Sequence, residues 1–175
     1  MSATTLLSWE QFLELEETAG KQELLDGELI ALPPAKMKHM EITQRIFLLL
    51  NSAPHGRRVW IETGYRLRRG WLQPDVSVTR VDHPVVDGWM QGAPMIALEV
   101  VSPANRPAHI EKKTAVYLEE GAVEVWVVYP ENRSMAVFRK ENWERITETY
   151  SCSLLNLTVD LRTIMPGEEA GSLPA

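Results

Sequence analysis

The chain has 175 residues, of which 45% are hydrophobic and 24% are charged, and its formal net charge is −6 at pH 7. These values are typical of a globular domain and exclude a chain that is disordered throughout. The negative charge argues against a protein that coats nucleic acid or anionic membranes indiscriminately, and the single cysteine excludes an intramolecular disulfide and a cysteine-rich zinc site.

The first predicted elements are a short helix, a β-hairpin and a longer helix. The sequence Ser-Trp-Glu-Gln that starts at Ser8 is a capping-box pattern and predicts a helix over residues 9–18. An Asp-Gly pair between two apolar runs predicts strands at residues 22–25 and 28–32, because a type I′ turn requires positive φ at both central residues. Apolar residues at helical spacing then predict a helix over residues 37–51.

The middle of the chain contains predicted strands around one helix. We predict strands over residues 58–68 and 73–79, followed by a loop rich in proline, glycine and aspartate. Residues 95–101 form a nearly unbroken apolar run, which is typical of a strand that is covered on both faces. A helix over residues 107–120 and a strand over residues 123–129 complete a crossover unit, whose two strands should be parallel and whose connection should be right-handed.

The last predicted elements form a second hairpin, at residues 135–139 and 143–147. The segment that contains Cys152 is polar, and residues 166–175 are expected to be a flexible tail. No linker or repeat divides the sequence, so residues 1–165 should form a single domain. The predicted fold class is α/β of the mixed α+β kind, with a mixed central β-sheet flanked by helices and a hairpin near each end.

Two carboxylates interrupt predicted strands that are otherwise apolar. Glu99 is the only charge in residues 95–101, and a buried carboxylate needs a cation, a hydrogen-bond network or a metal. Asp75 follows a proline at the start of the preceding strand, and a Pro-Asp pair taken alone is usually a turn or strand-start feature. Two carboxylates on neighbouring strands suit Mg²⁺, with Mn²⁺ as a substitute, because such an ion is held by one or two carboxylates, water and substrate phosphate.

A lysine on the next predicted helix is placed to join these carboxylates. At about 100° per residue, Ile110 and Tyr117 share one helix face, Lys113 lies at the edge of that face, and Lys112 points to solvent. Lys113 can therefore reach back to Glu99, although it could also snorkel past its neighbours. An aspartate, a glutamate and a lysine in one pocket are typical of a metal-dependent phosphodiester hydrolase, in which the lysine positions the attacking water or stabilises negative charge.

Several motifs stand in a specific order along the chain. They are Glu23-Leu-Leu-Asp-Gly-Glu28, Pro33-Pro34 with His39 opening a helix, Gln73-Pro74-Asp75-Val-Ser-Val, Leu98-Glu99-Val-Val-Ser102-Pro103, and Lys113 and Tyr117 followed by Gly121-Ala-Val-Glu-Val-Trp126. In this combination the sequence resembles the Uma-two family of endonucleases, also known as domain of unknown function 820. That family belongs to the PD-(D/E)XK restriction-endonuclease-like superfamily, and the resemblance extends from about Leu7 to about Leu161.

The resemblance implies a restriction-endonuclease-like core with Asp75 and Glu99 as catalytic metal ligands. The simplest motif of the superfamily has its catalytic lysine two residues after the glutamate, where this chain has Val101, whereas members of this family carry it on the following helix, at Lys113. The family also places auxiliary residues near the site, which in this chain are Glu23, Glu28, His39 and Tyr117. Independently of the family, two of these residues have structural alternatives. The role of Glu28 could be limited to stabilising the hairpin turn, and His39 could be a core or capping residue.

A local excess of arginine offers a surface for nucleic acid on this acidic protein. Five arginines and one acid fall in a stretch of thirteen residues, and such a strip could contact a phosphate backbone. From charge alone, a strand with solvated arginines is the more common explanation, because clusters of charge are frequent on protein surfaces. The residues of this strip are Arg57, Arg58, Arg66, Arg68 and Arg69.

The sequence therefore predicts a Mg²⁺-dependent endonuclease that hydrolyses phosphodiester bonds of nucleic acid, with DNA favoured over RNA. The alternatives are a catalytically silent nuclease-fold module that binds nucleic acid or a partner protein, and a hydrolase of small phosphoesters with the same site. We expect a cytoplasmic protein without a membrane partner, because no apolar run approaches about 20 residues. A homodimer is also expected, since cutting both strands of a duplex requires two sites.

Overall fold

The computed structural model describes residues 6–16, 20–53, 56–103, 105–165 and 167. The predicted C-terminal tail, apart from Gly167, and the end of the first predicted helix lie outside the described residues. Along the chain the elements are α1 (Trp9–Leu13), β1 (Lys21–Leu25), β2 (Glu28–Leu32), α2 (Met37–Ser52), β3 (Arg58–Ile61), β4 (Tyr65–Leu67), β5 (Gly70–Leu72), β6 (Val76–Thr79), β7 (Val85–Val86), β8 (Trp89–Gln91), β9 (Ile96–Val100), α3 (Pro107–Glu119), β10 (Glu124–Tyr129), a 3-10 turn (Pro130–Asn132), β11 (Ser134–Phe138), β12 (Trp143–Ile146), β13 (Thr149–Cys152), β14 (Leu157–Asp160) and α4 (Leu161–Ile164).

Most of the strands belong to two six-stranded sheets. The central sheet has the order β12-β11-β10-β9-β6-β3, and the peripheral sheet has the order β2-β1-β5-β4-β8-β7. In the central sheet β9 and β10 are parallel, as predicted for strands joined by a helical crossover, and the other neighbours are antiparallel. The predicted mixed sheet flanked by helices is therefore confirmed.

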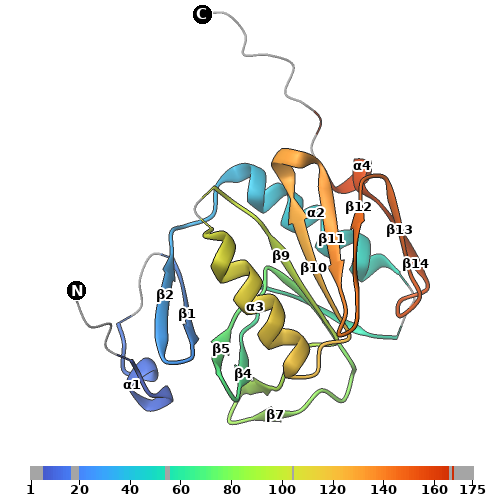
Figure 1. Cartoon of the computed structure of the whole chain (residues 1–175). Helices are drawn as coiled ribbons and strands as arrows, with labels where there is room; N and C mark the ends of the chain where they lie inside the picture. The colour runs from blue at the N-terminus through green and yellow to red at the C-terminus, as the bar shows by residue number, and fades with distance from the viewer. Residues whose placement is uncertain (1–5, 17–19, 54–55, 104, 166, 168–175) are drawn as a thin grey trace, which may run out of the picture.

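The central sheet is covered by α2 on one face and by α3 on the other (Figure 1). Side chains of β9 alternate between the two layers: Leu98 packs in a buried cluster with Ile46 of α2, whereas Ala97 packs in a second cluster with Val116 of α3. Burial on both faces explains why the sequence of this strand is almost continuously apolar. No helix among the described residues is long and apolar enough to cross a lipid bilayer.

The local signals near the N-terminus produce the structures they predict. Ser8 and Gln11 form a capping box at the start of α1, although this helix already ends at Leu13. Asp26 and Gly27 have φ values of 53° and 81°, as the turn between β1 and β2 requires.

Three segments differ from the prediction. The single strand predicted over residues 58–68 is two strands in different sheets, because the chain turns at Glu62, whose φ is 46°. The predicted loop that follows contains the small hairpin β7–β8, built on a second Asp-Gly pair with positive φ. The segment around Cys152 is not polar overall: it forms β13, β14 and α4, and the cysteine side chain is buried.

Candidate active site

The two predicted carboxylates lie next to each other at one edge of the central sheet. Asp75 immediately precedes β6 and Glu99 lies near the end of β9, not at its beginning. The two strands are antiparallel with Val76 opposite Leu98, so the next position outward in each strand is a carboxylate. Both side chains are almost entirely buried, with residue exposures of 3% and 4%. The antiparallel pairing, not proximity along the chain, therefore brings the two acids together.

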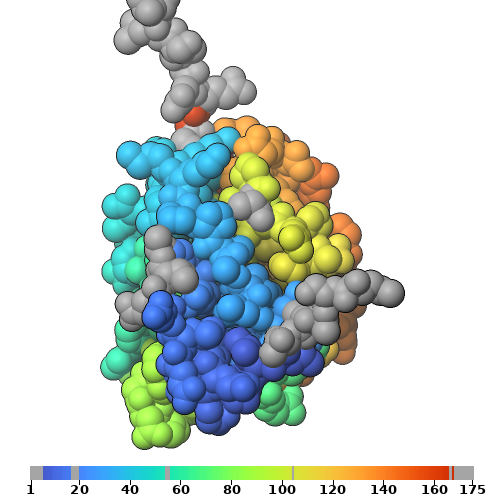
Figure 2. Space-filling view, turned by 90° about the vertical axis from the view of Figure 1, so that its left-hand side faces the viewer, coloured from blue at the N-terminus to red at the C-terminus, as the bar shows by residue number. Residues whose placement is uncertain are grey.

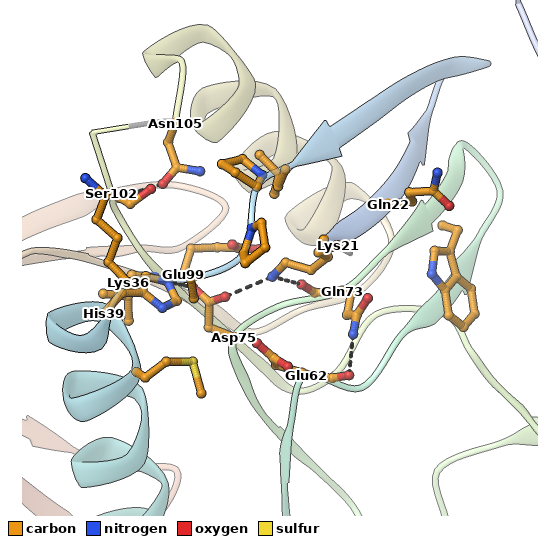
Figure 3. Close-up of a pocket in the computed structure, with 18 of the residues that line it drawn as sticks. Lys21, Gln22, Lys36, His39, Glu62, Gln73, Asp75, Glu99, Ser102 and Asn105 are labelled. Carbon is orange, nitrogen blue, oxygen red and sulfur yellow. Dashed lines mark hydrogen bonds and ion pairs between the residues drawn. The ribbon is translucent and has the colours of Figure 1, made fainter. Parts of the chain in front are cut away.

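Asp75 accepts hydrogen bonds through both carboxylate oxygens (Figure 3). Its Oδ1 atom lies 2.8 Å from Nζ of Lys21, and its Oδ2 atom accepts from the backbone N–H of Val100 at 2.7 Å and lies 3.2 Å from Nε2 of His39. Burial alone would raise the pKa of Asp75, but the Lys21 ammonium and His39 outweigh it and hold that pKa well below its usual range. The side chain is therefore ionised at neutral pH.

Glu99 is held from the other side by α3. Nζ of Lys113 donates to Oε1 of Glu99 at 2.6 Å and to Oε1 of Glu23 at 2.8 Å, and the Tyr117 hydroxyl donates to Glu99 at 3.1 Å. Burial raises the pKa of Glu99 against the lowering effect of the lysine, while the charge of Asp75 raises it further. Burial would lower the pKa of Lys113, but the carboxylates of Glu23 and Glu99 raise it above its ordinary value.

Glu23 is the third acid of the site, and part of its carboxylate has no partner. Its Oε1 atom accepts from the backbone N–H of Gln73 at 2.9 Å as well as from Lys113. Its Oε2 atom is buried without a hydrogen-bond partner, as is Nδ1 of His39, among the residues that the structure describes. Three carboxylates and two lysines share this region. Their mutual contacts leave one buried carboxylate oxygen and one imidazole nitrogen without a partner among the described residues.

Lys21 is the residue that the sequence analysis missed. Besides Asp75, its Nζ atom bonds the backbone carbonyl of Gln73 at 2.7 Å. Burial would lower the pKa of Lys21, but the nearby carboxylates, among which Asp75 has the largest effect, raise that pKa above its ordinary value. Alternation along β1 could have identified it, because Lys21, Glu23 and Leu25 occupy the same face of that strand, and Glu23 was a candidate residue.

The candidate active site opens into a cleft with a volume of about 910 Å³. Asp75, Glu99, Lys21 and His39 line this cleft, as Figure 3 shows. Lys113 is not part of the lining and is only 3% exposed. The two lysines of the site therefore differ in position: Lys21 faces the cleft, whereas Lys113 contacts the carboxylates from within the protein.

The donor set of this cleft fits a hard divalent cation. In the described part of the chain, no three His, Cys, Asp or Glu side chains form a ready-made metal cluster. Mg²⁺ and Mn²⁺ do not need one, because one or two carboxylates, water and a phosphate oxygen satisfy them. Asp75 and Glu99 supply two such carboxylates on one cleft, and Asp75 already neutralises a cation there, the ammonium of Lys21.

The structure assembles three of the four predicted auxiliary residues. Glu23, His39 and Tyr117 each contact one of the site's charged groups. Glu28 begins β2, pairs in register with Leu25, and forms no ion pair among the described residues. Its position beside the hairpin turn agrees with the alternative role of stabilising that turn.

The five predicted arginines do not form one continuous strip. Arg57 and Arg58 lie at β3 in the central sheet, whereas Arg66, Arg68 and Arg69 lie at β4 and the turn after it, in the peripheral sheet. The guanidinium of Arg66 stacks over an aromatic ring of α1, at 4.3 Å from its centroid. Arg68 and Arg69 form ion pairs with acids at the end of α3 and in the β1–β2 turn. The arginines are thus divided between two sheets, and two of them are neutralised within the protein.

Comparisons with known proteins agree with this fold. The Uma2 family model, described as "Putative restriction endonuclease", matches residues 9–167. The crystal structure of a "putative nuclease belonging to DUF820" from Anabaena variabilis is similar with a TM-score of 0.80 and 22% sequence identity, over 90% of this chain and 97% of that one. None of the curated proteins matches the sequence. At this level of identity the structural likeness establishes the fold.

Proposed function

The chain belongs to the Uma2 family, and from that membership we propose that it is a Mg²⁺-dependent endonuclease that hydrolyses phosphodiester bonds of DNA. The observation that carries this proposal is the pair of Asp75 and Glu99, two buried carboxylates on adjacent strands that line one cleft. Family membership supports nuclease chemistry in general; the metal and the choice of DNA are our proposal.

The carboxylates are prepared to hold a cation before substrate arrives. When bound, Mg²⁺ would supply a water of lowered pKa and neutralise charge on a phosphate oxygen. Asp75 is kept ionised by Lys21 and His39, and the N–H of Val100 fixes the orientation of its carboxylate. Glu99 is fixed by Lys113 and so presents its carboxylate to the same cleft.

Lys113 supports catalysis from behind the carboxylates. Two of its three N–H donors are directed at Glu99 and Glu23. The ion pair with Glu99 opposes the effect of burial, which raises the pKa of that carboxyl group, and the remaining N–H can orient a water beside it.

Lys21 has a different role because it faces the cleft. Its ammonium neutralises the oxygen of Asp75 that a metal ion would need. With a divalent cation held by Asp75 and Glu99, the Lys21 ammonium would instead be available to the cleft that it lines, where its positive charge would stabilise the scissile phosphate.

Cleavage of supercoiled plasmid tests the proposal. Purified wild-type protein is expected to nick the plasmid with Mg²⁺ or Mn²⁺ and to be inactive in EDTA. Asp75→Asn and Glu99→Gln should each lower the rate by about a thousandfold or more, because each removes a charged ligand without changing side-chain shape. Glu144→Gln is the matched control, because it neutralises an exposed carboxylate on β12, which does not line the cleft.

Calorimetric titration with Mn²⁺ separates the alternatives. Binding that disappears in Asp75→Asn, together with plasmid cleavage, supports the nuclease. Wild-type protein that binds DNA but neither binds the metal nor cleaves would instead be a catalytically silent module, and the proposal would be wrong.

A further inference from the structure

The cleft extends from the carboxylates to a cluster of three tryptophans. Trp9, Trp71 and Trp89 all line it, and they come from α1, β5 and β8. Their ring centroids are 5.6 Å apart for Trp9 and Trp71, 4.8 Å for Trp71 and Trp89, and 6.2 Å for Trp9 and Trp89. Figure 2 shows the dark-blue N-terminal segment beside the yellow-green β7–β8 segment on this face. The cluster exists only in the folded chain.

The cluster combines a fixed ring with an accessible one. Trp71 is only 9% exposed and lies so close to Gly64 that a Cβ atom there would overlap its ring. Trp89 meets this ring edge to face at 88° and is itself 40% exposed. The packing thus holds one indole in place while leaving another open to a ligand.

A polar side chain, Gln22, lines the same cleft as the tryptophans and the carboxylates. Gln22 lines the cleft next to Lys21, and its side-chain amide has no hydrogen-bond partner among the described residues (Figure 3). Trp71 and Asp75 are four residues apart, so their Cα atoms are separated by at most about 14 Å. A nucleic-acid strand whose phosphate lies at Asp75 therefore has its neighbouring bases within reach of the indoles and of an amide that can read base edges.

Charge argues for an unpaired strand rather than a duplex. Binding to duplex DNA depends mainly on many cation–phosphate contacts. This chain is acidic overall, and Arg68 and Arg69 are paired with its own carboxylates. Stacking of bases on aromatic rings supplies affinity without such a basic surface, but only unpaired bases expose their faces.

We propose that Trp71, Trp89 and Gln22 form a subsite for unpaired bases, so that the substrate is single-stranded DNA or DNA with an unpaired segment beside the cleaved bond. Trp89 stacks on a base, Trp71 holds that indole in position, and Gln22 hydrogen-bonds the base edge. This inference rests on the proposed nuclease function, because it names the form of DNA that the same cleft accepts.

Fluorescence anisotropy with a labelled single-stranded oligonucleotide and its duplex, both in EDTA, tests the subsite without hydrolysis. Wild-type protein is expected to bind the single strand at least about tenfold more tightly. Trp89→Ala should weaken this binding about tenfold and leave duplex binding unchanged. Trp143→Ala is the matched control, since this residue is 62% exposed on β12 and does not line the cleft.

Trp89→Ala could weaken binding only because it disturbs the packing of the tryptophan cluster. Gln22→Ala controls for this, because Gln22 is not one of the packed rings and its side-chain amide has no partner among the described residues. It should weaken single-strand binding severalfold at an unchanged melting temperature. Equal affinity of the wild type for the two DNA forms, or unchanged binding in both variants, would overturn the subsite. The binding assay and the plasmid assay fail separately. Loss of cleavage in Asp75→Asn with no effect of Trp89→Ala refutes the subsite alone. The reverse pattern refutes the proposed nuclease and leaves a cleft that binds unpaired bases without cleaving them.

Discussion

Two buried acidic clusters of this protein differ in how completely their charges are satisfied. Glu124, at the start of β10, is 3% exposed and accepts hydrogen bonds on both oxygens. Tyr150 donates to Oε1 at 2.6 Å, Arg139 donates to the same atom at 3.0 Å, and Trp126 donates to Oε2 at 2.8 Å. In the candidate active site, by contrast, the buried Oε2 of Glu23 has no partner among the described residues.

The difference separates a structural cluster from a functional one. The Glu124 cluster joins β10, β13 and Arg139, which directly follows β11, and its carboxylate does not line the cleft. Every acceptor in it is used, as expected where selection acts on stability. The candidate site instead concentrates like charges next to a cleft, an arrangement that costs stability and is typical of binding or catalysis.

Removal of the Glu124 carboxylate should give the largest loss of stability. Glu124→Ala leaves the buried donors of Tyr150 and Trp126 unused, while Arg139 keeps its ion pair with Glu144, and we expect the free energy of unfolding to fall by about 2–5 kcal/mol. Urea denaturation measures this change. Glu23→Ala is the matched comparison and should lose less than half as much, because Lys113 keeps its ion pair with Glu99. Equal losses would contradict the distinction between the clusters.

Alkaline pH should weaken the Glu124 cluster through Cys152. Burial, and then the charge of Glu124, raise the pKa of this thiol from 9.0 to about 11. Because the folded-state pKa is the higher one, the contribution to stability is complete below pH 9 and is lost as pH rises towards 11. Two pKa units correspond to about 2–3 kcal/mol.

Urea denaturation at a series of pH values up to 10.5 measures that loss, and Cys152→Ala should show a flatter curve than the wild type. The thiol should also react with a thiol reagent only after unfolding, since its residue is 1% exposed. Rapid labelling of the native protein would refute the assignment of this residue to a closed cluster.

Replacement of Lys21 should have a smaller effect than the changes above, and it should strengthen metal binding instead of weakening it. Lys21→Met removes the ammonium that competes for Asp75, so we expect Mn²⁺ affinity in calorimetry to rise about tenfold, or about 1.4 kcal/mol. The metal-free protein should melt at a lower temperature, because Asp75 loses a cation, and Mn²⁺ should restore it.

Lys112→Met is the control for this change. Lys112 lies on α3, 35% of its side chain is exposed, and it pairs with Asp26 rather than with a cleft carboxylate. Its replacement should leave Mn²⁺ affinity unchanged. A fall in affinity in Lys21→Met would show that this lysine supports the metal site instead of competing for it.

Local patterns in the sequence were sufficient for much of the fold and part of the site. The Asp26–Gly27 turn depends on two adjacent residues, and the crossover from β9 through α3 to β10 is visible as two apolar runs around a helical repeat. Helical periodicity also directed Lys113 at Glu99, which the structure confirms at 2.6 Å. These features share one cause: a short segment contains all the information that they need.

The tertiary structure alone decided which distant groups meet. Lys21 contacts Asp75 across 54 positions, and Lys113 contacts Glu23 across 90. The break at Glu62 sends β3 and β4 into different sheets, and with them the arginines that one predicted strand would have kept together. A sequence pattern determines whether an element is a helix or a strand and which of its faces is buried, because sterics and burial act residue by residue. The partner of each charge depends on how whole elements pack, and that packing is fixed only when the sheets and helices bury one another.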